Sequence, residues 1–409
     1  MKKLILLDFL IVLWLSCFAQ VWSDDFGAID SLHVMGYVAN VNDILNDNNE
    51  YLYIGGPFTY ANLEQVSQII KWDGYNYYKL SNGINPAGTV NTIAKFSNNI
   101  IVGGTFPNAS GAANTYYLAQ WNGTNWQSVG GGGINGEVMD LVVYNDTLYI
   151  SGNFNEIGEN TYYMVAAYND NNWINIGYWG QWVSALEIMN GELYGGGYYG
   201  FRRYLGGTEW EIFDEQPSNN VWELKADSIN SLLYICGGFS MYGDMTSHGV
   251  AVWDGFNFES TGAHCYAVIW PQATAIYRGD LFTGCGRYYD NETEYRTYIS
   301  RWNGESWDSI GGAFNSNIFA LEVFRDTLYI GGGFTHWGGD SPIPTHRSKG
   351  LVKLFMPDNG CDYLKPRINT WADTFYLNGG EAVVNLYNNN PYVDSWEWDY
   401  DDGGVSTSH

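Results

Sequence analysis

The chain has 409 residues, of which 17% are aromatic, 50 are glycine and only 15% are charged, a composition typical of an all-β protein with many turns. Its net charge is −26 with only 18 Lys and Arg, which argues against nucleic acid as a partner, because phosphate binding needs basic side chains. We expect this acidity to keep an exported protein soluble; binding of calcium or of a cationic partner is the alternative.

The first 19 residues have the three parts of an export signal. Lys2 and Lys3 supply the charge, Leu4–Leu15 the apolar run, and Cys17-Phe18-Ala19 a small-x-small cleavage site. Lipidation of Cys17 is a second interpretation. The apolar run is short for a membrane span and no later stretch is apolar enough, so we expect no transmembrane segment. The mature chain is predicted to be secreted or displayed on the outer cell surface.

Four cysteines follow the signal, at Cys236, Cys265, Cys285 and Cys361. An even number in an exported chain permits two disulfides, with one local bridge within residues 236–285; free buried thiols are the alternative. No Cys-x-x-Cys spacing for zinc occurs. We expect no cofactor other than the calcium alternative.

A glycine-ended apolar strand occurs seven times along the chain. The copies are Leu52–Phe58, Ile100–Phe106, Leu148–Phe154, Leu193–Tyr199, Leu233–Phe239, Leu281–Arg287 and Leu328–Phe334. Their starting positions differ by 48, 48, 45, 40, 48 and 47 residues. An even period of this size is typical of the blades of a β-propeller.

Six of the units also contain two aromatic residues on either side of a polar turn. The pairs are Trp72 with Tyr77, Trp121 with Trp126, Tyr168 with Trp173, Tyr204 with Trp210, Trp253 with Phe258, and Trp302 with Trp307. Their Asp-Gly and Asn-Gly turns supply the positive φ that tight hairpins need. Each unit is therefore predicted to have four antiparallel strands, with aromatic residues packed between blades.

The seventh unit lacks a fourth strand, because no Trp strand follows Gly350–Phe355. Ile29–Leu32 matches Trp307–Ile310, the fourth strand of unit six. We therefore predict that residues 27–35 form the outer strand of the last blade, which closes the ring and removes a free edge. The predicted fold is all-β: a seven-bladed propeller over residues 24–362, closed by an N-terminal strand.

These repeats resemble those of the kelch family. In that family a glycine pair ends strand two, Tyr or Trp lies in strand three, and Trp lies in strand four. The resemblance covers about residues 27–360, with Trp-Asp or Trp-Asn, as at Trp72-Asp73, where the family usually has Tyr-Asp. The repeats are also similar to kelch-like repeats of large exported bacterial surface proteins. The resemblance implies a propeller and usually a binding role, but no particular ligand.

The tail has a different pattern, which begins near Pro366. It resembles the PKD-type immunoglobulin-like domain, whose signature runs Trp-Asp-Phe-Gly-Asp-Gly; the matching residues are Trp398, Asp399, Tyr400, Asp402 and Gly403, with Asp401 where Gly is usual. The resemblance implies a partial β-sandwich over residues 363–409. Because about half of such a domain is present, we expect the sequence to be a fragment.

Longer loops join strands two and three and join each blade to the next, so they are expected on one face, the likelier binding face of a propeller. The longest covers residues 335–349. Its candidate ligand-binding residues are His336, Trp337, Asp340 and His346, with a metal as a weaker interpretation of the same group. Other loops contribute Tyr162, Tyr163 and Tyr288, for which packing is the alternative to ligand contact.

No residue pattern specifies a reaction, since neither Gly-x-Ser-x-Gly nor His-Glu-x-x-His occurs. The leading expectation is a monomeric exported binding or adhesion module with a protein or glycan ligand. The alternative is a carbohydrate-active enzyme, a lyase, oxidase or glycosidase, with its site at the axial mouth of the propeller. Two carboxylates about 5–9 Å apart, or a cluster of His and Tyr, at that mouth would favour the enzyme. An aromatic rim without titrating groups would favour the binding module.

Overall fold

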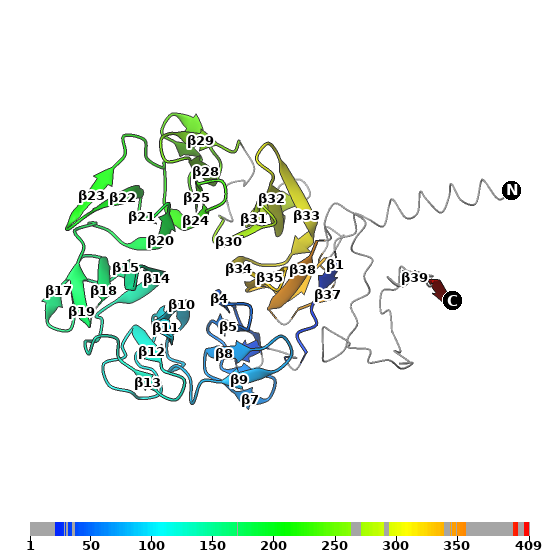
Figure 1. The fold of residues 1–409 in the computed structure, drawn as a ribbon, viewed down its shortest axis with the longest axis horizontal. Coiled ribbons are helices and arrows are strands. Elements are labelled where there is room, and N and C mark those ends of the chain that lie inside the picture. Colours follow the sequence, from blue (N-terminus) through cyan, green and yellow to red (C-terminus); the bar gives the residue numbers. More distant parts are fainter. Residues whose placement is uncertain are drawn as a thin grey trace. The chain divides into compact units, whose positions relative to one another are not determined.

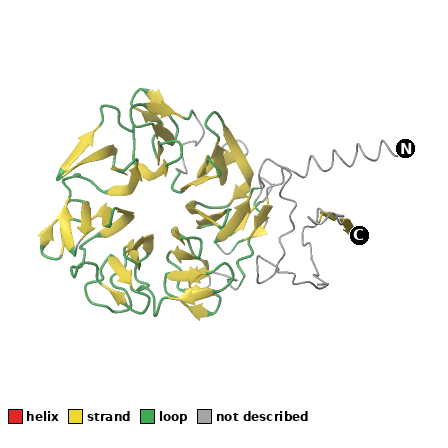
Figure 2. Cartoon of the chain, in the orientation of Figure 1, coloured by secondary structure: helices red, strands yellow, loops and turns green. Residues whose placement is uncertain are grey.

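The computed structural model describes residues 21–356 except 28, 30, 31, 35, 36, 170, 263–270, 290–293, 339–343, 345 and 349; it also describes 396–399 and 405–408. Val21–Phe355 form one compact unit. This unit is a ring of seven β-sheets, and its described residues contain no helix (Figures 1 and 2). The predicted all-β, seven-bladed propeller is therefore confirmed. In the described part of the chain, no helix is long and apolar enough to cross a membrane.

Each blade has four antiparallel strands that follow one another from the axis outward (Figure 1). Blade one contains β4 (Asp43–Asp47), β5 (Tyr51–Gly55), β8 (Ile69–Trp72) and β9 (Tyr77–Lys79). Blade two contains β10 (Val90–Phe96), β11 (Asn99–Gly104), β12 (Leu118–Trp121) and β13 (Trp126–Gln127). Blade three contains β14 (Glu137–Tyr144), β15 (Thr147–Asn153), β18 (Val165–Asn169) and β19 (Asn172–Asn175).

The remaining blades repeat this plan. Blade four contains β20 (Val183–Met189), β21 (Glu192–Gly197), β22 (Gly200–Gly206) and β23 (Glu209–Ile212). Blade five contains β24 (Val221–Asp227), β25 (Leu232–Gly237), β28 (Val250–Trp253) and β29 (Phe258–Ser260). Blade six contains β30 (Thr274–Tyr277), β31 (Asp280–Tyr289), β32 (Glu294–Trp302) and β33 (Trp307–Phe314). Blade seven contains β34 (Ile318–Phe324), β35 (Thr327–Gly332), β38 (Leu351–Phe355) and β1 (Val21–Ser23).

The glycines at the ends of the second strands allow neighbouring blades to approach. A Cβ at Gly103 would lie 2.5 Å from Val138 of the next blade, and a Cβ at Gly331 would lie 2.5 Å from Val41. Both distances are shorter than any side chain tolerates, so only glycine fits there. The glycines have a packing role, as the repeat pattern indicated.

Aromatic residues of the outer hairpins join the blades. The six sequence pairs are cross-strand partners in the sheets, for example Trp121 with Trp126. The indole N–H of Trp126 also donates to the backbone oxygen of Leu80, 2.9 Å away in the previous unit. Trp210 and Trp307 make equivalent bonds to Ile176 and Thr261, at 2.6 and 3.0 Å. Each bond ties an outer strand to the segment that leaves the preceding blade.

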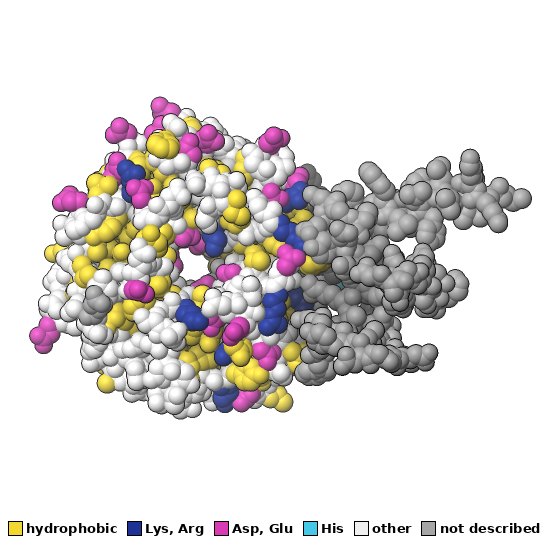
Figure 3. Space-filling model, viewed as in Figure 1, with side chains coloured by type: hydrophobic (Ala, Val, Ile, Leu, Met, Phe, Trp, Pro, Cys, Tyr) yellow, Lys and Arg dark blue, Asp and Glu magenta, His cyan; other side chains and the backbone are white. Residues whose placement is uncertain are grey.

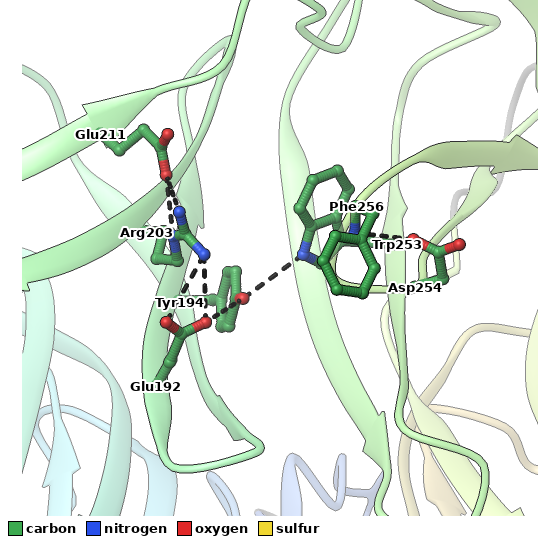
Figure 4. Close-up of polar contacts among 7 residues, drawn as sticks. All are labelled: Glu192, Tyr194, Arg203, Glu211, Trp253, Asp254 and Phe256. Atoms are coloured by element: carbon green, nitrogen blue, oxygen red, sulfur yellow. Dashed lines mark hydrogen bonds and ion pairs between the residues drawn. The ribbon is translucent and has the colours of Figure 1, made fainter.

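Blades four and five are joined by a buried polar contact as well (Figure 4). Trp253 donates its indole N–H to the Tyr194 hydroxyl at 3.3 Å, and that hydroxyl donates to Glu192 at 2.8 Å. Arg203 bonds Glu192 and Glu211, which completes the network drawn in Figure 4. Phe256, in the turn after Trp253, is 86% exposed.

The ring is closed by an N-terminal strand, but not by residues 27–35 as we predicted from the sequence. The outer strand of blade seven is β1, in which Trp22 pairs with Leu354 just as Trp307 pairs with Trp302 in blade six. Trp22 fills the space between blades, with its ring 6.0 Å from Phe314 and 5.6 Å from Trp337. Ile29 cannot fill that space with an aliphatic side chain; it lies instead in the core that includes Val41.

The segment that we had assigned to closure belongs to a separate small sheet. Its strands are β2 (Leu32–Val34), β3 (Tyr37–Val38), β6 (Tyr60–Ala61) and β7 (Glu64–Gln65). β6 and β7 arise from the loop between β5 and β8. The N-terminal segment therefore covers part of blade one after it has completed blade seven.

The cysteines divide into two kinds. Cys236 is a buried free thiol, whereas Cys285 is disulfide-bonded. Cys265 and Cys361 lie outside the described residues. In the C-terminal unit, β39 (Trp396–Asp399) and β40 (Val405–Ser408) form a hairpin across the PKD-like residues. The PKD assignment itself remains a prediction.

Candidate functional site

The alternating direction of the strands gives each blade two different ends. Short turns join strands one to two and three to four at one end, which we call the hairpin end. Connections between strands two and three and between blades lie at the other, which we call the long-loop end. Figure 2 shows these loops around the ring.

Blade four differs from its neighbours at the long-loop end. Blades one, three, five and seven each insert a two-stranded extension between strands two and three: β6–β7, β16 (Glu156–Ile157) with β17 (Asn160–Thr161), β26 (Met241–Tyr242) with β27 (Met245–Thr246), and β36 (His336–Trp337) with β37 (His346–Arg347). In blade six, β31 and β32 are themselves long, and blade two has an irregular loop. Blade four has only Tyr198 and Tyr199 between β21 and β22.

Four aromatic rings lie together where the extension of blade four is missing. We call Trp182, Tyr198, Tyr199 and Trp222 the aromatic patch. The Trp182 and Trp222 rings stack 5.1 Å apart at 21°, Tyr198 meets Trp182 edge-on at 5.8 Å, and Tyr199 meets Tyr198 at 4.7 Å. Tyr198 is 44% and Tyr199 50% exposed. Both indoles are partly exposed.

The turn that exposes the two tyrosines has a strained backbone conformation. Tyr199 has φ +47°, in the left-handed region where glycine or asparagine is usual. For a residue with a Cβ this conformation costs about 1–2 kcal/mol. The neighbouring sheet holds it, because Gly197 and Gly200 pair on either side of the turn and Tyr198 N–H donates to Trp182 O at 3.2 Å.

A second aromatic pair lies at the same end, on the adjoining blade. Tyr163 and Tyr178 meet edge-on at 5.1 Å and are 37% and 64% exposed. Tyr178 belongs to the connection that continues to Trp182. Arg202 stacks 4.5 Å from Trp179 and donates to Tyr178 O at 3.4 Å, and both contacts hold this connection in place.

Figure 3 shows an opening at the centre of the ring, with charged side chains at its edge. Inner strands of five blades carry the charged residues Asp43, Asp140, Glu187, Glu223, Lys225 and Glu322. Each of these residues keeps some surface open to the channel, although protein surrounds it on its other sides. We call this group the channel residues.

Three channel carboxylates bridge successive blades. Asp43 accepts from the amide of Ile44 at 2.8 Å and from that of Ile93, in blade two, at 2.6 Å. Asp140 does the same with Leu141 and Leu186, both at 2.7 Å. Glu187 accepts from Ile188 at 2.9 Å and from Ala226, in blade five, at 3.3 Å. Most inner strands carry a register shift near their start.

Burial raises the pKa of the channel carboxyls. The pKa values of Asp43 and Asp140 are raised to about 7, since burial outweighs their amide hydrogen bonds. Burial and the charges of Asp140 and its neighbours raise the pKa of Glu223 well above its usual range. Burial opposes the charge on Lys225, but the surrounding carboxylates outweigh it and its pKa is raised. Unlike Asp43, Asp140 and Glu187, Glu223 accepts its hydrogen bond from a side chain, the hydroxyl of Thr274, at 3.3 Å.

The predicted site in residues 335–349 is only partly assembled. His336 and His346 lie on paired strands, but His336 pairs with Arg347 and His346 with Trp337, so the two imidazoles lie on opposite sides of this ribbon. Trp337 is buried and stacks on His346 at 4.8 Å. Asp340 lies outside the described residues. Among described residues, no three Asp, Glu, His or Cys side chains are grouped as metal ligands.

The predicted tyrosines have different environments. Tyr162 is 5% exposed and packs on Trp173, whereas its neighbour Tyr163 is exposed. Tyr288 lies in β31, in register with Tyr295. Sequence reasoning missed the aromatic patch, because it looked for the longest loop. The available signal was the 40-residue spacing between units four and five, the shortest in the series.

Comparisons with known proteins show no family for this chain. No protein-family model and no curated protein matches the chain. The extracellular domain of a putative hybrid two component system from B. thetaiotaomicron is 13% identical with TM-score 0.49, covering 80% of this chain and 40% of that one. Virginiamycin B lyase from Staphylococcus aureus, in complex with quinupristin, is 10% identical with TM-score 0.47 over 82% and 99% of the two chains. A Niastella koreensis GH74 enzyme is 10% identical with TM-score 0.45 over 78% and 55%.

Proposed function

We propose that this chain is an exported binding protein that holds a protein or glycan ligand at the long-loop end of its propeller. The supporting observation is the aromatic patch, in which Tyr198 and Tyr199 stay exposed at blade four, where only these two residues join strands two and three. Exposed aromatic clusters of this kind are enriched at binding surfaces. Export is supported by the signal-like residues 1–19 and by the disulfide at Cys285.

The channel supports binding more than catalysis. Asp43, Asp140 and Glu187 each bond backbone amides of two blades, so their carboxylates already have a structural role. The aromatic patch contains no acid or base. The patch supplies the aromatic surface expected of a binding module, whereas the acids that titrate near neutral pH lie in the channel.

The test is a ligand screen of the full-length chain with variants at both ends of the propeller. The labelled chain is applied to arrays of glycans and of secreted and cell-surface proteins. Binding should fall at least tenfold in Tyr198→Ala and Tyr199→Ala, and should be unchanged in Phe256→Ala, which removes an exposed ring at the hairpin end. Failure to bind any ligand, or loss of binding only in Phe256→Ala, would refute the proposal.

A carbohydrate-active enzyme is a second candidate, and Glu223 favours it. A carboxyl with a raised pKa is suited to donate a proton in glycosidic bond cleavage. The experiment is a turnover screen on polysaccharides with wild type and Glu223→Gln. Activity that is lost in Glu223→Gln at unchanged Tm would support the enzyme; absence of turnover in wild type would dismiss it.

A further inference from the structure

We propose that the aromatic patch binds a neutral polysaccharide chain; this inference rests on the proposed function and names its ligand class. The four rings provide flat apolar surfaces of unequal tilt: the two indoles are nearly parallel, while Tyr198 is steeply inclined to Trp182. The C–H faces of sugar rings pack on such surfaces, and tyrosine hydroxyl groups at their edges bond sugar hydroxyls.

Unpaired polar atoms beside the patch match the chemistry of sugar hydroxyls. The indole N–H of Trp222 and the side-chain oxygen of Asn220 are buried and have no hydrogen-bond partner among the described residues. Asn220 precedes β24, so both groups lie at the long-loop end of blade five. One is a donor and the other an acceptor, and a hydroxyl can satisfy either. Exposed Gln181, next to Trp182, adds a side-chain amide that can do both.

The surrounding charges favour a ligand without negative charge. Asp214 and Glu215 are exposed in the connection from blade four to blade five, whereas Arg202, the nearby cation, already stacks on Trp179 and donates to Tyr178 O. The patch itself has no charged side chain to pair with an anion. An anionic polymer would therefore meet repulsion, whereas a neutral one would not.

The left-handed conformation of Tyr199 gives its side chain no advantage for folding. Glycine would occupy this left-handed turn position without steric cost. Tyr199 is half exposed, and its ring contacts Tyr198. Residues in unfavourable backbone conformations are often found at functional sites. We therefore expect the exposed ring of Tyr199 to contact the ligand.

The experiment is affinity electrophoresis of the full-length chain in native gels that contain a soluble polysaccharide. The neutral probes are mixed-linkage β-glucan, galactomannan and dextran; the anionic probes are polygalacturonate and alginate. We expect retardation by at least one neutral polymer and by neither anionic polymer. Tryptophan fluorescence, titrated with the same polymer, should change in wild type and change less in Trp222→Ala, which assigns the signal to the patch among the 18 tryptophans of the chain.

Variants separate ligand contact from folding. Trp222→Ala and Tyr198→Ala should each weaken binding about tenfold or more. Tyr199→Gly should weaken binding severalfold while its Tm stays the same or rises, a combination that a purely structural role would not give. Phe256→Ala is the matched exposed-ring control and should bind as wild type does.

The outcomes distinguish this inference from the proposed function. Binding only of the anionic polymers, or neutral binding that persists in Trp222→Ala, Tyr198→Ala and Tyr199→Gly, would overturn the inference. A protein ligand that is lost in the patch variants, without polysaccharide binding, would also overturn it but leave the proposed function intact. Failure to bind any glycan or protein would refute both.

Discussion

At the scale of single residues, the inner strands combine two requirements that usually conflict. A carboxylate at the start of a blade can bond free amides of its own and the next blade, as Asp43 and Asp140 do. The same position places the carboxylate deep in the ring beside others like it. The hydrogen bonds stabilise the ring, whereas burial and mutual repulsion favour the protonated acid.

This conflict predicts greater stability at mildly acidic pH. In the folded protein the pKa values of Asp43 and Asp140 are raised from 3.8 to about 7. The stability that the two protonated acids contribute to the folded state is therefore fully present below about pH 4 and is lost as the pH rises towards 7. We expect Tm to be higher at pH 5 than at pH 8, and the difference to shrink in Asp43→Asn/Asp140→Asn. The pH profile of Tm for both proteins measures this.

A suitable control is Asp254→Asn, because the amides of Asn257 and Phe256 lower the pKa of Asp254. That substitution should not reduce the gain in Tm at pH 5. If Tm changed with pH in the same way in wild type and in the Asp43→Asn/Asp140→Asn variant, these two acids would not cause the stabilisation at acidic pH.

Indole donors are the second residue-scale feature. Trp126→Phe should lower the free energy of unfolding by about 1 kcal/mol, because it removes the bond to Leu80 O but keeps most of the ring. Trp126→Ala should lower it by about 3–5 kcal/mol, because it also empties a buried site. Denaturant unfolding compares the two, and equal losses would mean that the hydrogen bond contributes nothing.

At the scale of elements, the repeats predicted six of the blades by strand and turn. Cross-strand aromatic pairs such as Trp302 with Trp307 are visible in sequence because both partners lie on one tight hairpin. The closing strand was misplaced because its partner, β38, lies at the other end of the unit. Local matching then favoured Ile29–Leu32 over Trp22, although only Trp22 supplies the ring that an outer strand needs.

The closing strand gives a prediction of its own. Trp22→Ala should lower the free energy of unfolding by about 3 kcal/mol or more, since Trp22 packs on Phe314 of blade six and on Trp337 of the blade-seven extension. Leu63→Ala, at a position 96% exposed, is the control and should change it by less than about 0.5 kcal/mol. Similar stability of wild type and Trp22→Ala would show that β1 does not secure the ring.

At the scale of the whole molecule, part of the acidic excess lies where charges cannot move apart. The net charge is −26, and the channel places five carboxyl groups around Lys225. The sequence shows the excess but not this concentration, because the channel residues come from five separate units. The aromatic patch was hidden for the same reason: its rings come from two connections and from the start of β24, which meet only when blades four and five stack.

Salt should therefore stabilise the propeller. Raising NaCl from about 10 mM to 0.5 M shortens the Debye length from about 30 Å to a few Å and screens this repulsion. At pH 8 we expect Tm to rise with salt, and to rise less at pH 5, where the channel acids bind protons. A Tm that falls with NaCl at pH 8 would contradict this.

The pairing of β1 with β38 has a consequence for the order of folding. The first strand of the propeller finds its partner only in the last, so this contact spans the entire unit. Hairpins within a blade close short loops and form early, but closing a loop of this length carries a large entropic cost. An open arc of blades is the expected last intermediate. The joining of its two ends then sets both the refolding rate and the point at which unfolding begins.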